Sequence, residues 1–167
     1  MIFDDAETNR LWMKDMQWKR QCIGGLWDEA EWHFPWLPQN VDLCCAYTHA
    51  GMYLGWLADH GLTSEYCNLC NENELDEFKM RAITPQNFFV SVEGKIATRD
   101  LNELGDAFTS ICFLPRLGQV SFWSDYKSTF VSERLSFYEV ADTWENYKLL
   151  CDKLNQRLSE FSNCHSL

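Results

Sequence analysis

The chain has 167 residues, about the length of one domain, and its 46% hydrophobic and 15% aromatic residues supply a core and argue against disorder. Its formal net charge of −11 disfavours nucleic acid and anionic membranes as partners, because both carry the same sign, and favours a basic partner. No run approaches the roughly 20 apolar residues that span a bilayer, and the start MIFDDAETNR lacks the layout of a signal peptide, so we expect a cytoplasmic protein.

The N-terminal part of the chain is predicted to divide at residue 26. Residues 1–26 are expected to form an extension with at most one short helix, over Asp4–Cys22, and residues 27–167 a single globular domain. The segment that follows the extension alternates poorly at either period and runs into prolines. It is predicted to be an ordered extended segment that lays Trp27 and Trp32 on the core.

The stretch from Asp42 to Leu62 is the centre of the predicted fold. Small and apolar residues recur at helical spacing on both of its sides, and a helix that is apolar all round is a buried helix. The side-chain oxygen of Asp42 is placed to cap the helix, and Gly61 supplies the left-handed residue that commonly ends one. The sequence therefore predicts a buried central helix over residues 42–60, with the other segments packed around it.

The segments after the central helix carry helix signals of their own. Thr84-Pro85 combines a capping hydroxyl with proline at the first helical position, where the missing N–H costs nothing. Thr98 is predicted to open the next helix, which carries a well-spaced apolar stripe. The run Phe122–Phe130 is predicted to be helical, although its aromatic and β-branched residues leave a strand open.

The last helix signal is the clearest capping pattern in the chain. Asp142 is predicted to cap forward and Glu145 to reach back, at the start of a regular amphipathic helix that extends to Phe161. Together these segments predict a mainly α single domain of five or six helices around the central helix 42–60, with one short hairpin at most.

Several short strings stand in an order that matches a known pattern. They are HAGMYLGW (49–56), DHGL (59–62), DLNELGDAF (100–108), SDY (124–126) and DTWENY (142–147). As an ordered set they resemble an uncharacterised bacterial domain family with the patterns HxGMxLxW, DLNExGxAF and DTWxNY, over about Trp27–Phe161. Small acidic bacterial proteins of this kind resemble the immunity proteins of polymorphic or contact-dependent growth inhibition toxin systems. The resemblance implies a toxin inhibitor.

The 8 cysteines do not form a recognisable metal or disulfide framework. Cys67 and Cys70 have the two-residue gap of half a zinc site, but the second half is missing, and Cys44, Cys45 and His60 could complete it only through the fold. In a reducing compartment the thiols are more simply small buried hydrophobes. We therefore expect no metal and no cofactor.

Asp28, His33, His49 and His60 are the candidates for an acid/base or metal cluster, since histidine titrates near neutrality. The competing interpretation is that His49, on a helix packed on both sides, is a hydrogen-bonded core group that ties segments together. We favour this second interpretation and predict no catalytic residue.

The acidic run around Leu75 is the candidate partner-binding surface. Like-signed carboxylates mimic a phosphate backbone and speed association with a basic partner by steering, although a charge run can also be only a solvated face. The predicted partner-binding residues are Glu72, Glu74, Asp76, Glu77, Glu103 and Asp106.

These observations favour a binding protein over an enzyme. The leading hypothesis is an immunity protein that acts as a monomer within a heterodimer and blocks a basic protein toxin, most simply a nuclease, without binding nucleic acid or membrane. The alternatives are a small hydrolase or ligand-binding enzyme that uses His33 and His49, and a purely structural interaction module. An enzyme needs its polar groups converging in a cleft, whereas an inhibitor needs them spread over a face.

Overall fold

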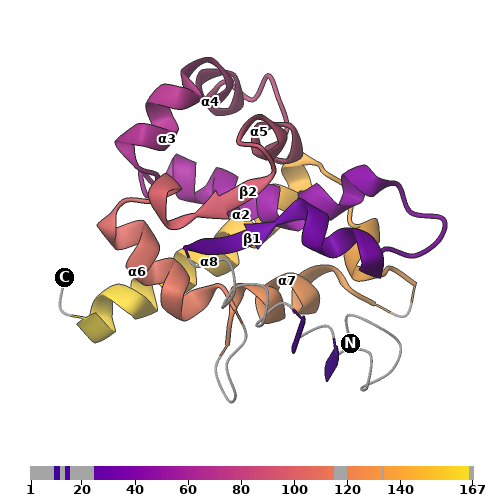
Figure 1. Ribbon diagram of the computed structural model, residues 1–167. Helices are drawn as coiled ribbons and strands as arrows, with labels where there is room; N and C mark the ends of the chain where they lie inside the picture. Colours follow the sequence, from indigo (N-terminus) through magenta and orange to yellow (C-terminus); the bar gives the residue numbers. More distant parts are fainter. Residues whose placement is uncertain (1–9, 12–13, 16–24, 115–119, 133, 166–167) are drawn as a thin grey trace.

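Helix α2 (Thr48–Asp59) lies at the centre of the fold, and the other elements surround it (Figure 1). The computed structural model describes residues 10–11, 14–15, 25–114, 120–132 and 134–165. From residue 25 onward the described chain contains seven α-helices, four short 3-10 helices and one sheet of two strands. The predicted mainly α single domain is confirmed, with more helices than the five or six expected.

Burial of α2 on every side follows from its composition. Each residue from Thr48 to Ala58 is buried, as the sequence predicts. The predicted N-terminal part of this helix is wrong in detail, because Leu43–Tyr47 forms the 3-10 helix η2 instead. Asp42 still acts as a cap, since its side chain accepts a hydrogen bond from the backbone N–H of Cys44 at 2.9 Å. Gly61 follows the helix with a φ of +65°, the left-handed residue that the sequence predicts.

The sheet joins two segments that are far apart in the chain. Strand β1 (Leu26–Glu29) pairs antiparallel with β2 (Lys95–Ala97), so the short hairpin allowed by the sequence is not how the strands are connected. The segment that follows the N-terminal extension is predicted to be extended, and it is extended only over β1. It turns at Ala30 into the 3-10 helix η1 (Ala30–Trp36), and Trp27 and Trp32 are buried as expected.

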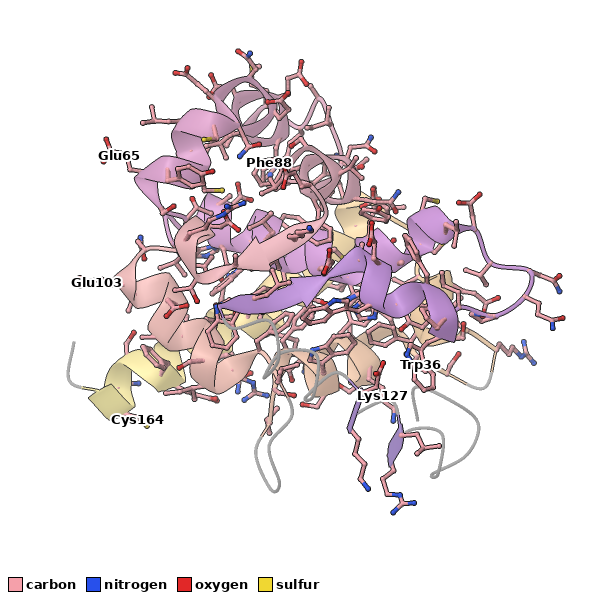
Figure 2. The ribbon with its side chains drawn as sticks, viewed as in Figure 1. Trp36, Glu65, Phe88, Glu103, Lys127 and Cys164 are labelled. Carbon is pink, nitrogen blue, oxygen red and sulfur yellow. The ribbon has the colours of Figure 1, made fainter. Side chains whose placement is uncertain are left out.

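Helices α3 (Glu65–Cys70), α4 (Glu72–Lys79) and α5 (Pro85–Ser91) cover one side of α2 (Figure 1). The predicted start of α5 is confirmed, because the Thr84 hydroxyl accepts from the backbone N–H of Asn87 and proline occupies the first turn. Phe88 and Phe89 bury their rings in the core, and Figure 2 shows Phe88 lying between the surrounding ribbons.

Helix α6 (Glu103–Cys112) begins later than predicted. Thr98–Asp100 forms only the 3-10 turn η3, and the Asn102 side chain caps α6 by accepting from the backbone N–H of Gly105 at 2.9 Å. Leu104, in the first turn of α6, is 38% exposed. The run predicted to be helical over Phe122–Phe130 is the α-helix α7, so this prediction is confirmed.

Helix α8 (Trp144–His165) follows the short 3-10 turn η4 (Phe137–Glu139), but its predicted cap is wrong. Thr143 takes that place, since its hydroxyl accepts from the backbone N–H of Asn146 at 3.2 Å. Asp142 instead accepts from the backbone N–H of Gln86 in the first turn of α5, 3.3 Å away. A carboxylate there complements the positive end of a neighbouring helix and joins α5 to the segment before α8.

Two sequence predictions concern the ends and the environment of the chain. Of the helix predicted over Asp4–Cys22, only residues 10–11 and 14–15 are described, and these are helical; the rest lies outside the described residues. None of the described helices is long and apolar enough to cross a bilayer.

Candidate functional site

A buried cluster of polar side chains lies beside α2. Asp28 lies in β1, His33 lies in η1 and His49 lies in the first turn of α2. His33 Nε2 is 2.8 Å from Asp28 Oδ1, and His49 Nε2 is 3.2 Å from Asp28 Oδ2. The exposed fractions of these residues are 2%, 0% and 1%, respectively. The Asp28 carboxylate therefore bridges two imidazoles inside the protein, and we call these three residues the histidine–aspartate cluster.

The hydrogen bonds of the cluster assign its protons. An ionised carboxylate can only accept, so both Nε2 atoms carry a proton and donate to Asp28. His33 Nδ1 is 3.0 Å from the hydroxyl of Tyr138, which is buried in η4. His49 Nδ1 is buried and has no hydrogen-bond partner among the described residues. The cluster is thus well paired on the His33 side and incomplete on the His49 side.

Burial and neighbouring charges set the protonation states. Burial raises the pKa of Asp28, but attraction to His33 and hydrogen bonds from both histidines outweigh it and hold that pKa well below its usual range. Burial and repulsion from His33 lower the pKa of His49 to about 4, although Asp28 acts in the opposite direction. At neutral pH Asp28 is therefore ionised and His49 is neutral.

Aromatic rings enclose the cluster. The Trp123 ring lies 5.7 Å from His33 in a stacked arrangement and 4.9 Å from His49, and Phe137 lies 5.2 Å from His49. Trp123 and Phe137 are themselves stacked at 4.8 Å. These walls exclude bulk water, so each electrostatic interaction inside is stronger than it would be at the surface.

Of the four candidate residues named from the sequence, the structure brings together Asp28, His33 and His49. His60, at the C-terminal end of α2, lies apart: its Nδ1 is 2.9 Å from the backbone oxygen of Trp56, and its ring packs on the Trp56 indole. The sequence analysis missed Tyr138 and Trp123. Tyr138 is 105 positions from His33, and Trp123 lies farther along the chain from His49 than any local pattern extends, so no local pattern marks either one.

The predicted acidic surface is on α4. Glu72, Asp76 and Glu77 are exposed, Glu74 is half-buried, and the buried side of the helix is formed by Leu75 and Phe78. The preceding helix α3 adds exposed apolar side chains to this acidic segment. Tyr66 and Leu69 are 51% and 66% exposed, and Met80, after the last turn of α4, is 72% exposed. This set of side chains, from Tyr66 to Met80, is called the α3–α4 surface below.

The two remaining predicted partner residues lie on α6, which Figure 1 places away from α4. Glu103 is exposed, and an isolated bridge between Thr63 and Leu101 brings the start of α6 beside the start of α3. In Figure 2, Glu65 and Glu103 lie at the same outer edge of the molecule. Asp106 is half-buried, and its Oδ1 accepts from the indole N–H of Trp27 at 2.9 Å, so it joins α6 to β1.

A surface cavity of about 440 Å³ between the end of α4 and α8 is a further candidate that the sequence analysis missed. Arg81 lies there with a φ of +62°, because it takes the left-handed position that glycine usually occupies after a helix. Its guanidinium pairs with Asp59 at 2.8 Å and lies 4.4 Å from the Trp144 ring. These contacts offset the backbone strain, and Tyr147 donates to the same Asp59 at 2.7 Å. Through these contacts Arg81 and Asp59 join the end of α4 to α8.

The seven cysteines among the described residues are all free of disulfides. Burial and the nearby Asp100 raise the pKa of the Cys67 thiol to about 12. A thiol with such a pKa is protonated at neutral pH and is a poor nucleophile and metal ligand. Cys67 is a buried side chain and Cys70 an exposed one.

Comparison with known proteins identifies the family of the chain. The family model described as Domain of unknown function (DUF7832) matches residues 26–140 of the 167. The chain belongs to this family. No curated protein and no solved structure matches it. The DUF7832 region begins in β1 and ends just after η4, so it contains the histidine–aspartate cluster, Tyr138 and the α3–α4 surface, whereas DTWENY and α8 lie beyond it.

Proposed function

We propose that this DUF7832 protein is an immunity protein that binds a basic toxin through the α3–α4 surface and covers the toxin's active site. The observation that carries the proposal is the composition of that surface, in which exposed apolar side chains lie within an acidic segment. Residues 65–79 contain five carboxylates and one lysine, within a chain of net charge −11. Such a surface attracts a cationic protein at a distance and has apolar area to bury on contact.

The position of the charges in α4 argues against a purely structural role for all of them. Glu72 and Glu74 lie in the first turn, where the helix dipole favours negative charge and a carboxylate contributes about 0.3–1 kcal/mol. Asp76 and Glu77 lie in the last turn, where the same dipole disfavours them. Helix stability does not explain these last two carboxylates, whereas attraction of a basic partner does.

Exposed apolar side chains supply the second part of the argument. Tyr66, Leu69 and Met80 are each more than half exposed, in a molecule that buries most of its aromatic rings. Tyrosine and methionine are enriched at the centres of protein interfaces, where a few well-packed side chains carry most of the binding free energy. The charged side chains around them would then form the rim, which sets the association rate.

A nuclease is the favoured class of toxin for an electrostatic reason. An enzyme that holds a phosphate backbone has a basic substrate-binding face. An acidic helix such as α4 competes for that face directly. The enzyme alternative for the present chain is weaker, because the side chains of His33 and His49 are at most 1% exposed and a substrate needs access to the groups that act on it.

Co-purification with the product of the neighbouring gene tests the proposal. The full chain is coexpressed with that product, both as wild type and with Glu72, Glu74, Asp76 and Glu77 changed to their amides. A matched control changes four exposed carboxylates on other elements by the same charge: Glu31, Glu93, Glu145 and Asp152. Retention of the partner by the wild type and the control, with a weakened complex for the α4 variant, supports the proposal. A neighbouring product that is never retained, or one retained equally by all three, contradicts it.

A further inference from the structure

We propose that Asp28, His33 and His49 form a site for one divalent transition-metal ion, for which zinc is the natural probe. The site is distinct from the α3–α4 surface and does not depend on the proposed function. Its three ligand atoms come from β1, η1 and α2, and they all lie within 4.8 Å of one another. Two imidazoles and one carboxylate form a donor set that suits zinc and ferrous iron.

The distances suit coordination as well as hydrogen bonding. A metal ion about 2.1 Å from each ligand atom holds neighbouring ligand atoms about 3.0 Å apart in octahedral geometry and about 3.4 Å apart in tetrahedral geometry. The two nitrogen-to-oxygen distances at Asp28 are 2.8 Å and 3.2 Å. These two contacts have nearly the spacing of neighbouring ligands, and an ion would draw together the ligand atoms that lie farther apart, up to 4.8 Å. Each imidazole then ligates through Nε2 as a neutral ring whose proton lies on Nδ1.

The groups behind the ligands are arranged as in a metal site. A metal-bound histidine usually donates its second ring N–H to an oxygen, which fixes the orientation of the ring. The Tyr138 hydroxyl is placed for this role, 3.0 Å from His33 Nδ1. The aromatic rings of Trp123 and Phe137, 4.9 Å and 5.2 Å from His49, hold the ligands in a water-poor environment.

His49 turns its Nε2 toward Asp28, 3.2 Å away, and this is the atom that we assign as its ligand. A bound ion would stabilise the cluster through Nε2, and it would tie β1 and η1 to α2, with η4 held through Tyr138. Because the ligands are enclosed by aromatic rings, we assign the ion a structural role.

Metal binding to the full chain, treated with a chelator and then with zinc or cobalt(II) alone, tests the inference. We expect one ion per chain by elemental analysis and a higher thermal midpoint with zinc. We also expect a cobalt spectrum without thiolate charge-transfer bands, because the ligands are nitrogen and oxygen. Asp28→Asn and His49→Gln should weaken zinc binding by about 100-fold, and Tyr138→Phe, which removes only the supporting hydroxyl, by about 10-fold.

Matched controls separate this site from the other possible ligands. His60→Gln changes a histidine outside the cluster on the same helix, and Cys67→Ser with Cys70→Ser removes the paired thiols. Both should bind zinc like the wild type. If the ligand variants fail to fold, the cobalt spectrum of the wild type and the zinc affinity of Tyr138→Phe test the inference instead. The inference is overturned if the folded wild type binds no stoichiometric ion, if thiolate bands appear, or if zinc follows the cysteines.

Discussion

Gly51→Ala is predicted to destabilise the protein, although alanine is the better helix former. Gly51 lies in α2 where the start of α5 crosses it. A Cβ there would lie 2.7 Å from the backbone oxygen of Pro85 and 2.9 Å from Cα of Gln86. Side chains can rotate away from such a contact, but the backbone of a neighbouring helix can only move as a unit. The two helices would have to separate by several tenths of an ångström.

The magnitude is the difference between two opposing effects. Alanine gains about 1 kcal/mol over glycine in a helix interior, whereas overpacking a core costs about 1–3 kcal/mol and more when backbone must shift. We expect a net loss of about 1–2 kcal/mol, which lowers the thermal midpoint of a chain of this size by about 2–8 °C. Ala107→Gly, on the exposed side of α6, measures the propensity effect without a packing change.

Urea and thermal unfolding of both variants decide the matter. Both should be less stable than the wild type: Ala107→Gly through propensity alone, and Gly51→Ala in spite of it. A Gly51→Ala protein that melts at or above the wild-type temperature would refute the close approach of α2 and α5.

Three further changes test other parts of the structure. Leu54→Asp should unfold the domain, because a charge on this fully buried residue costs several kcal/mol of a stability of about 5–15; circular dichroism checks this, and a melt within a few degrees of wild type would contradict the central position of α2. Arg157→Met should cost about 3 kcal/mol in urea unfolding, since it strands the buried Asp125 carboxylate that Arg157 binds at 2.8 and 3.0 Å; a cost below about 1 kcal/mol would show that this pair is not needed. Asp76→Asn with Glu77→Gln should leave the free energy of unfolding unchanged or raise it by up to about 1 kcal/mol, and a clear destabilisation would mean that these carboxylates support the fold.

The sequence predicts the elements whose signals are local. The residues of α2 are apolar or small on all sides, so its burial follows from composition, and α5 begins at Thr84-Pro85 because cap and proline both act within one turn. The predicted start of α6 is wrong because two candidate caps stand four residues apart. Asn102 prevails over Thr98, since the Asp100 side chain accepts from the backbone N–H of Ala97 and closes a separate turn first.

Long-range partners account for what could not be predicted. Asp142 is of the residue type, and in the position, expected for the N-cap of α8. Its carboxylate instead accepts a hydrogen bond from the first turn of α5, 56 positions away. For the candidate site, the sequence identified Asp28, His33 and His49 as residue types that could act together. It could not supply Tyr138, whose hydroxyl reaches His33 across 105 positions. Nothing in the spacing of residues along one element encodes such a contact.

Stopped-flow or surface-based kinetics with the neighbouring gene's product, at low and high salt, test the central claim most directly. Steering acts over about a Debye length, ~10 Å at 0.1 M salt, so the wild-type association rate should fall as salt rises. Amides at Glu72, Glu74, Asp76 and Glu77 should lower the low-salt association rate by about 10-fold and flatten its salt dependence, with dissociation changed by less than about 3-fold. A variant that associates as fast as the wild type at low salt would contradict the account and leave the α3–α4 surface as a solvated face.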